Sequence, residues 1–398
     1  MMKKIMVLAA GILQVPIIKK ARELGYYVIA ADGDINAVGL KYADKAIVAN
    51  ITDENVMLKI ARDENIDGVI HPCSEVSMSV MGYINDSLGL HGISKAMAYK
   101  ATNKHLMRKA FEKSGAPSPQ SYCTVSMDEA WHIFSEKFGT NGILKPSRNS
   151  GSRGIAKIER GIDKKLFAEL YERAYQESRD KQVLIEQFIE GPEFSVEIIV
   201  WKGTVNVLTV TDKKTTGAPY FVELGHNQPS VFPKDIVELV KNAAIDGVKA
   251  LELDNCACHA EIKVENSKAY IMEIGARLGG DFISTELTHL STGIDMVAAA
   301  IDIALGKEPC LDVKENKHGV CIRYFCPKPG ILSTIENLDF LNDEHIYASE
   351  IYCKSGDAIK EVKSSLDRSG HVIVMDDTVE HAINRADNIL EKVVFKTE

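Results

Sequence analysis

The stretch 259–280 reads HAEIKVENSKAYIMEIGARLGG. Apolar and polar residues alternate on both sides of a short polar segment, residues 265–268. Because strand side chains alternate between the two faces of a sheet, this pattern predicts a β-hairpin. A hairpin centred near Ser267 would place Glu261 and Glu273 directly opposite each other on one face of the sheet.

Two opposed carboxylates need a compensating charge, because like charges that face each other across two strands are destabilising. A divalent cation supplies that charge, and two carboxylates with few other protein ligands suit Mg²⁺ bound together with nucleotide phosphates. Arg277 follows Glu273 closely and could bind a phosphate or a carboxylate through two oxygens. A solvated acidic strand edge is the alternative interpretation, and the local pattern favours neither.

The composition is that of an ordinary soluble globular protein, with 398 residues, 45% hydrophobic and 26% charged. A net charge of −9 argues against nucleic acid or an anionic membrane as the main partner. No apolar run reaches the length of a transmembrane helix. Eight cysteines are scattered along the chain without paired CxxC motifs, which predicts free thiols and a reducing, cytoplasmic location.

The first 95 residues alternate between apolar runs and helical segments, which predicts a small doubly wound α/β domain. The acidic residues Asp32 and Asp34 follow the second expected strand, where a dinucleotide-binding fold would place an acid. Only Gly11 of a GxGxxG pattern is present, so a structural turn is favoured over a phosphate-binding loop. The expected strands are 3–10, 26–31 and 68–71, and the expected helices are 15–24 and 53–64.

Two features of the next part of the chain favour an anionic ligand. We expect Thr102 to cap a helix that extends to Lys113, with Lys104 in its first turn. A cation there opposes the helix dipole, which suggests a bound anion, although a solvated lysine is the commoner explanation of this pattern. The sequence PSRNSGSRG at residues 146–154 joins two expected strands and lacks the GK[ST] of a Walker loop. Its amides and cations could fold over phosphates, or it could be a mobile hairpin tip.

The rest of the chain predicts a second α/β part and then a β-rich part. A sparsely patterned loop at 211–233 carries Lys213 and His226, and loops of this length are usually functional or disordered. The expected strands are 142–145, 155–158, 183–188, 194–201, 204–211, 319–326, 346–353 and 371–375. The expected helices are 127–138, 164–179, 234–252, 293–305 and 378–390.

Taken in order, these features resemble the ATP-grasp superfamily over nearly the whole chain. They comprise a small α/β domain, a lysine-bearing helix, a lysine–proline strand with a Gly/Ser loop, EQFIEG at 186–191, and paired strand glutamates. Within the superfamily the chain is most similar to the L-amino acid ligase branch. The similarity lies in EIGARLGG at 273–280, GHNQP at 225–229 and PKPG at 327–330.

The resemblance implies an α/β ATP-grasp architecture of three domains. The N-terminal domain, 1–95, would be a doubly wound preATP-grasp domain. The ATP-grasp domain, 96–310, would consist of two α+β subdomains, with a mobile lid at about 117–185. The remaining residues, 311–398, would form a small β-rich C-terminal domain.

The resemblance also implies which residues bind ATP and Mg²⁺, for which Mn²⁺ could substitute. Residues that would contact the phosphates are Lys104, Lys145 and the loop residues Ser150, Gly151, Ser152 and Gly154. The adenine edge would contact Glu186 and the backbone of Gln187, Phe188 and Ile189, and the ribose would contact Glu193. Glu261 and Glu273 would ligate the metal. Many relatives carry a further asparagine ligand at the position of Gly275, so water or another side chain would complete the coordination here.

The implied activity is that of an ATP-dependent carboxylate–amine ligase that acts through an acyl phosphate on small molecules, with an amino acid as the expected substrate. Arg277 would anchor the substrate carboxylate, and His226 would shape the pocket beside it. A structural ion pair of Arg277 with Asp281 or Glu286 is the alternative. Alternatives for the whole protein are a purine-pathway or carbamoyl-phosphate-type enzyme, or a nucleotide-binding module without catalysis. A nicotinamide oxidoreductase fits least well, and a homodimer stays open.

Overall fold

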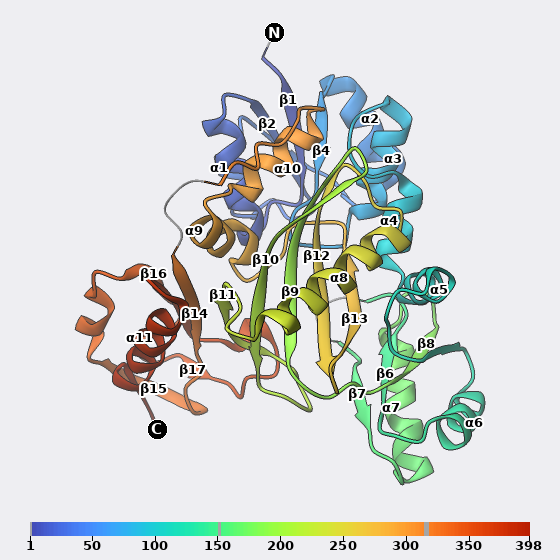
Figure 1. The fold of residues 1–398 in the computed structure, drawn as a ribbon. Coiled ribbons are helices and arrows are strands. Elements are labelled where there is room, and N and C mark those ends of the chain that lie inside the picture. Colours follow the sequence, from blue (N-terminus) through green and yellow to red (C-terminus); the bar gives the residue numbers. More distant parts are fainter. Residues whose placement is uncertain (1, 150–152, 314–317) are drawn as a thin grey trace.

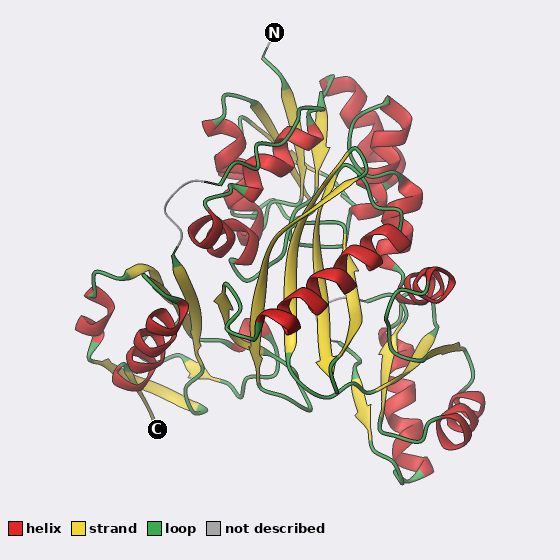
Figure 2. Ribbon diagram, viewed as in Figure 1, coloured by secondary structure: helices red, strands yellow, loops and turns green. Residues whose placement is uncertain are grey.

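The computed structural model describes residues 2–149, 153–313 and 318–398. The described residues form four β-sheets covered by helices, which confirms the predicted α/β class (Figure 2). The long strands of the central sheet run through the middle of the molecule (Figure 1). The N-terminal domain lies beyond one end of these strands, and two smaller α/β parts flank the other end (Figure 1).

The N-terminal domain is a parallel sheet in the order β3-β2-β1-β4. Its inner strands are apolar because both faces of the sheet are covered. The strand β3 was not predicted, since it lies at the sheet edge and most of its residues are exposed. The strands are β1 (Lys4–Leu8), β2 (Tyr27–Asp32), β3 (Lys45–Val48) and β4 (Gly68–Ile70). The helices are α1 (Val15–Glu23), α2 (Glu54–Glu64) and α3 (Met78–Leu88).

Two helices, α4 (Lys95–Thr102) and α5 (Lys104–Ser114), connect this domain to the rest of the protein. The predicted cap at Thr102 is wrong, because Thr102 ends α4. Asn103 caps α5 instead, and its side chain accepts a hydrogen bond from the Leu106 amide. Lys104 is therefore the first residue of α5, directly at the helix N-terminus.

A four-stranded antiparallel sheet in the order β5-β8-β6-β7 forms the next part of the protein. Its helices pack on it through an aromatic cluster in which Phe134 stacks on Phe167 at 5.7 Å between ring centroids. The strands are β5 (Ser121–Thr124), β6 (Gly142–Pro146), β7 (Ala156–Ile158) and β8 (Val183–Gln187). The helices are α6 (Met127–Lys137) and α7 (Lys164–Glu177).

The central sheet is antiparallel, with the strand order β13-β12-β9-β10-β11-β14-β18-β16. The helix α8 (Lys234–Ala250) packs against β12 and β13 (Figure 1), whereas α10 (Met296–Ala304) lies between this sheet and the N-terminal domain. The first five strands are β13 (Lys268–Gly275), β12 (Cys256–Glu265), β9 (Glu193–Trp201), β10 (Thr204–Thr215) and β11 (Glu223–Gln228). The last three are β14 (Gly319–Phe325), β18 (Gly370–Asp376) and β16 (Ile346–Ile351).

The hairpin of β12 and β13 is the one predicted from residues 259–280, with one added feature. Asn266 and Ser267 form its two-residue turn, and both have positive φ (50° and 58°), as a type I′ turn requires. In the register of this turn, Ile262 pairs with Ile271. The register then shifts by one residue, so that Glu261 pairs with Glu273.

The C-terminal strands predicted at 319–326, 346–353 and 371–375 are confirmed, and all three extend the central sheet. A separate sheet of β15 (Gly330–Glu336), β17 (Ala358–Ile359) and β19 (Val394–Thr397) was not predicted. The closing helix expected at 378–390 is present as α11 (Val379–Lys392), which packs on β14 and β18.

Two other expectations are wrong in part. The loop predicted at 211–233 contains the end of β10 and the whole of β11, a strand whose polar His226 and Gln228 are buried. Its hydropathy pattern therefore does not resemble a strand. The helix expected at 293–305 is shorter and follows a π-helical turn, Ile283–Leu287, and a short helix α9, Thr288–Thr292.

Within the described residues, each helix on its own is too short or too polar to cross a membrane. The bent pair Ile283–Thr292 and Met296–Ala304 has the length and composition of a membrane-spanning helix only when the two segments are combined. The second of these is buried along most of its length between the N-terminal domain and the central sheet.

Candidate functional site

The candidate site lies where β12 and β13 run toward the first residues of α5, the end of β6 and the loop after β4. Lys104 of α5 donates a hydrogen bond to Glu273 Oε1 at 2.9 Å and another to the Asn149 carbonyl at 3.1 Å. The Lys104 amide donates to the Ser147 carbonyl. These bonds bring two predicted site residues, Lys104 and Glu273, into direct contact beside the end of the Gly/Ser segment.

Burial opposes the charge of Lys104, but the nearby carboxylates of Glu273 and Glu75 outweigh that cost and raise its pKa. Lys104 therefore stays an ammonium ion although its side chain is largely shielded from water. A charged lysine at a helix N-terminus, held by an acid, is well placed to bind an anion there.

A second buried lysine, Lys213, connects three acids. Its Nζ lies 2.6 Å from Glu193 Oε1, 2.9 Å from Glu261 Oε1 and 3.8 Å from Glu223 Oε1. Burial favours the neutral amine, yet the three carboxylates raise the pKa of Lys213 well above its usual value. The sequence placed Lys213 in a loop, whereas it lies on β10 and links the expected ribose-binding and metal-binding residues.

The other side of Glu261 faces a buried network. The His259 Nδ1 atom lies 2.5 Å from Glu197 Oε1, and its Nε2 lies 3.9 Å from Glu261 Oε1. Burial lowers the pKa of His259, but the Glu197 carboxylate outweighs it and raises that pKa to about 9. Ser284 donates to the other Glu197 oxygen at 2.6 Å and accepts a hydrogen bond from the Gly279 amide.

This network fixes the charge and the position of Glu261. Burial alone would raise the Glu261 pKa, but Lys213 and His259 hold it well below its usual value. Neither Glu197 nor His259 was predicted as a site residue. A histidine two positions before a metal-ligand candidate, on the same strand face, is the sequence signal that could have indicated one.

Glu186 lies in a buried network of ion pairs. Its buried carboxylate accepts hydrogen bonds from Arg108 Nε at 2.6 Å and Nη2 at 3.2 Å, and its Oε2 lies 2.9 Å from Lys145 Nζ. These two cations outweigh burial and hold the Glu186 pKa far below its usual range. Both carboxylate oxygens are thus engaged by the protein, so Glu186 orients Lys145 in this structure.

The backbone that follows Glu186 forms the connection between the two sheets. The amides of Gln187 and Phe188 donate to the carbonyls of Gln120 and Asn141. Within the described residues, the buried Ile189 has no acceptor for its amide, while its carbonyl accepts a hydrogen bond from Lys263. An unpaired amide and a polar backbone edge are compatible with recognition of a planar base.

Arg277 projects from the loop that follows β13. Its Nη2 lies 3.6 Å from Glu75 Oε1, its Nη1 donates to the Leu278 carbonyl, and its buried Nε has no partner among the described residues. A Cβ atom at Gly275 would lie 3.2 Å from Arg277 Cγ. The glycine that replaces the asparagine of many relatives therefore leaves room for the arginine.

The structural ion pairs considered for Arg277 from the sequence are wrong. Asp281 accepts two hydrogen bonds from Arg368, at 2.8 and 2.9 Å, and lies 3.4 Å from His226 Nε2. Glu286 accepts a hydrogen bond from Tyr347. Glu75, in the turn after β4, is the acidic neighbour of Arg277.

The side chain of His226 is buried on β11. Within the described residues, its Nδ1 has no hydrogen-bond partner. Through Asp281 it is linked to Arg368, whose guanidinium stacks on the Tyr324 ring at 3.6 Å. The structure does not bring His226 into contact with Arg277, so its predicted role beside the substrate stays a prediction.

The Gly/Ser segment is described only in part. Ser150, Gly151 and Ser152 lie outside the described residues. Gly154 has a φ of 75°, and a Cβ there would lie 2.8 Å from Glu177 Cβ and 2.9 Å from Pro146 Cγ. Only glycine fits this position without a shift of its neighbours.

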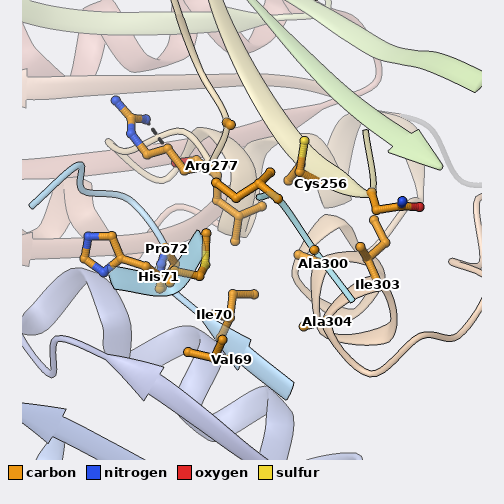
Figure 3. Close-up of a pocket in the computed structure, with 16 residues that line it drawn as sticks. Val69, Ile70, His71, Pro72, Cys256, Arg277, Ala300, Ile303 and Ala304 are labelled. Atoms are coloured by element: carbon orange, nitrogen blue, oxygen red, sulfur yellow. Dashed lines mark hydrogen bonds between the residues drawn. The ribbon is translucent and has the colours of Figure 1, made fainter. Parts of the chain in front are cut away.

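A small apolar cavity lies behind Arg277, between the N-terminal domain and the central sheet (Figure 3). It is lined by Ile70, Cys256, Ala300 and Ile303, among others, and the guanidinium of Arg277 points away from it (Figure 3). Its volume of about 40 Å³ has room for only a few water molecules at most. The cavity is therefore too small for a substrate.

The donor atoms of the site fit a magnesium ion shared with a ligand. Within the described residues there is no group of three or more His, Cys, Asp and Glu side chains able to hold a metal. The opposed pair Glu261 and Glu273 supplies two carboxylates, as expected for Mg²⁺, which takes few protein ligands and completes its shell with phosphate oxygens and water. In this structure, Lys104 and Lys213 balance the negative charge of the two carboxylates, which such an ion would neutralise when bound.

Comparison with known proteins identifies two domains along the chain. Residues 138–286 match the ATP-grasp domain, and residues 323–398 match L-amino acid ligase C-terminal domain 2. The alanine–anticapsin ligase of Bacillus subtilis is 27% identical over 256 residues, which cover 59% of this chain and 53% of that ligase. The chain thus spans about half the length of this curated relative.

Two solved structures share the fold over its whole length. The L-amino acid ligase from Bacillus licheniformis superimposes with a TM-score of 0.84, at 18% identity, over 100% of this chain and 99% of that one. The phosphoribosylglycinamide synthetase from Anaerococcus prevotii gives 0.79 at 24% identity, over 100% of both chains. These two likenesses show the fold alone, and the family match shows that the chain contains an ATP-grasp domain at residues 138–286. Its C-terminal part is an L-amino acid ligase C-terminal domain.

Proposed function

We propose that this protein is an ATP-dependent ligase that joins the carboxylate of an amino acid to an amine. The observation that carries the proposal is the opposed pair Glu261 and Glu273, held between Lys104, Lys213 and the arginine Arg277. Two carboxylates flanked by cations suit a magnesium–nucleotide complex next to a second, anionic substrate.

The residues of the site would divide the work as follows. Lys104 and Lys145 hold the ATP phosphates, and Glu261 and Glu273 hold Mg²⁺, which neutralises phosphate charge when it is bound. Glu186 and Arg108 are positioning residues, because Glu186 forms an ion pair with Lys145 and is itself held by Arg108. This assignment replaces the role of the Glu186 side chain at the adenine edge, while the backbone of residues 187–189 and Glu193 keep their predicted roles.

The reaction balances without an external oxidant or reductant. An oxygen of the substrate carboxylate attacks the γ-phosphorus of ATP, giving an acyl phosphate and ADP. The nitrogen of the amine then attacks the carbonyl carbon, the C–O bond to phosphate breaks, and phosphate leaves as the amide forms and the nitrogen loses a proton to solvent. The chain contributes position and charge, since Arg277 can follow the carboxylate as it becomes a phosphorylated group.

The L-amino acid ligase C-terminal domain and the similarity to an alanine–anticapsin ligase support an amino acid as substrate. The phosphoribosylglycinamide synthetase, which shares the fold over the full length, supports a purine-pathway amine as the second candidate. The eight cysteines, all among the described residues, are free thiols, which supports a location in the reducing cytoplasm.

One assay tests the proposal and its alternatives. Purified protein is incubated with ATP and Mg²⁺, and ADP and phosphate are measured with pools of L-amino acids, with phosphoribosylamine plus glycine, and with bicarbonate. We expect ADP formation that requires an amino acid and yields a new amide by mass spectrometry. ADP formation only with phosphoribosylamine or bicarbonate would establish the purine or carbamoyl-phosphate alternative, and tight ATP binding without turnover would establish a binding module.

A further inference from the structure

The segment that follows the Arg277 loop has an unusual backbone. Asp281 and Phe282 have φ angles of 51° and 63°, in the left-handed region that residues other than glycine rarely adopt. They lead directly into the π-helical turn Ile283–Leu287, and π-helical turns occur frequently at functional sites. Such strained residues cost free energy and persist only where the surrounding structure holds them. Specific contacts must therefore keep this segment in place.

Ser284 supplies such a contact from within the π-helical turn. Its buried hydroxyl donates a hydrogen bond to Glu197 Oε2 at 2.6 Å and accepts one from the Gly279 amide at 2.7 Å. Gly279 lies two residues after Arg277 in the chain. One hydroxyl group thus ties the loop that carries Arg277 to a buried carboxylate of β9.

The same carboxylate is linked to the proposed metal ligand Glu261. Glu197 Oε1 lies 2.5 Å from His259 Nδ1, and His259 Nε2 lies 3.9 Å from Glu261 Oε1. Glu197 is completely buried, and each of its oxygens contacts a protein group, so it holds its neighbours in one arrangement. Glu197 therefore connects the strand that carries Glu261 with the loop that carries Arg277.

The packing around Glu197 is tight. A Cβ atom at Gly279 would lie 2.6 Å from His259 Nδ1 and 3.1 Å from Glu197 Oε2. The first of these distances is far inside van der Waals contact, and the imidazole that the Cβ would meet is itself held by Glu197. Any side chain at position 279 must therefore displace either His259 or the loop.

We propose that Ser284 is a positioning residue that fixes the distance between Glu261 and Arg277. In the proposed reaction, Glu261 holds the metal on the ATP phosphates, and Arg277 holds the carboxylate that attacks the γ-phosphorus. The attacking oxygen must approach phosphorus in line with the leaving group, and a misplacement of about 1 Å can lower the rate about 100-fold. The inference rests on the proposed ligase function and adds to it a residue that acts only through its neighbours.

The S284A variant tests the inference, because alanine removes the group that both donates to Glu197 and accepts from Gly279. A panel of amino acids and plain carboxylic acids is assayed with ATP, Mg²⁺ and hydroxylamine, which converts an acyl phosphate into a hydroxamate. The acid that gives the most hydroxamate is then used for kinetics. We expect kcat to fall roughly 10- to 100-fold in S284A. The KM for the acid and the calorimetric affinity for ADP with Mg²⁺ should stay nearly unchanged, since every binding group is still present.

S291A is the matched control. Ser291 is a buried serine of α9, close to the π-helical turn, and its hydroxyl donates a hydrogen bond to Gln228 at 2.9 Å. Its removal also leaves a buried polar group without its partner, so the melting temperature should fall in S291A as it does in S284A. The kcat of S291A should nevertheless equal that of the wild type.

Two further variants keep the test decisive if S284A does not fold. S284T retains the hydroxyl group and should keep kcat closer to the wild-type value than the alanine variant does. G279A disturbs the same contacts from the other side, because its Cβ would meet His259, and it should reproduce the loss of kcat with nearly unchanged nucleotide affinity.

The outcomes separate this inference from the proposed function. The same kcat in S284A and S291A would overturn the inference, while the ligase function would stand. A loss of affinity for ADP with Mg²⁺ as large as the loss of kcat would also overturn it, since Ser284 would then support the nucleotide site as a whole. A wild-type protein that forms hydroxamate from none of the acids would overturn both.

Discussion

Glu261 and Glu273 face each other across β12 and β13 because the register of the hairpin shifts by one residue between Ile262 and Glu261. With the two-residue turn at Asn266 and Ser267, a regular ladder would place Met272 opposite Glu261. The shift leaves the Met272 carbonyl outside the ladder, and Arg108 Nη2 donates a hydrogen bond to it at 2.7 Å. Arg108 therefore stabilises the β-bulge that aligns the two acids and also fixes Glu186.

The first prediction concerns the opposed acids. Replacing both Glu261 and Glu273 with glutamine should abolish Mg²⁺-dependent turnover, because amide oxygens carry no charge to hold the ion. The variant should still fold, although Lys104 and Lys213 lose carboxylate partners and some stability will be lost. Turnover and circular dichroism on the same preparation check both points, with E238Q on the exposed face of α8 as the control.

Much of this arrangement could be predicted from local sequence, since the alternation in 259–280 and the paired glutamates depend on neighbouring residues. The residues that were missed are joined by contacts far apart in the chain. Lys213 contacts Glu261 across 48 positions, and Arg108 contacts Glu186 across 78. No periodicity within one segment indicates such pairs, and they depend on the order of strands in the sheet.

The strand β11 shows a second limit of sequence patterns. Hydropathy identifies strands by apolar residues on one face, but His226 and Gln228 of β11 are polar and buried. Gln228 is satisfied by Thr211, at 2.6 Å, and by Ser291, at 2.9 Å. A strand with partners on both sides can bury such side chains when each finds a hydrogen bond, and the sequence then resembles a loop.

The second prediction concerns Lys145. Replacing it with methionine should weaken ATP affinity by roughly 1.5–3 kcal/mol, the scale of a hydrogen bond to a charged group. The paired Glu186 would keep Arg108, so the protein should remain folded. Isothermal calorimetry with ATP measures the affinity, and K164M, which removes a surface ion pair with Asp128, is the control. Unchanged affinity in K145M would contradict the phosphate-binding role.

The third prediction concerns pH. The pKa of His259 is raised from about 6.5 to about 9 by Glu197, so the folded state binds a proton that the unfolded state releases above pH 6.5. The contribution of this pair to the free energy of unfolding should be fully present below pH 6.5 and should be lost between pH 6.5 and 9. The loss should be on the order of 3 kcal/mol. Other groups titrate in this range, so the difference in unfolding free energy between wild type and H259Q is the quantity to measure. A difference that does not change across this window would contradict the charged His259–Glu197 pair.

The last prediction separates binding from structure at Arg277. Changing it to lysine keeps the charge but removes the planar fork that can hold two oxygens. If Arg277 anchors the substrate carboxylate, ATP should still bind while amino-acid-dependent ADP formation falls by roughly 10- to 100-fold. A purely structural arginine would instead lower the melting temperature and leave turnover nearly intact.

Arg368 is the matched control for this test, because it makes two hydrogen bonds to Asp281 and lies against Tyr324. R368K should behave as a structural change, with a lower melting temperature and a small effect on turnover per folded molecule. Measuring melting temperature, ATP affinity and ADP formation on both variants gives opposite patterns if Arg277 contacts the substrate. Identical patterns in R277K and R368K would mean that Arg277 only supports the loop after β13, and the carboxylate would then need another anchor.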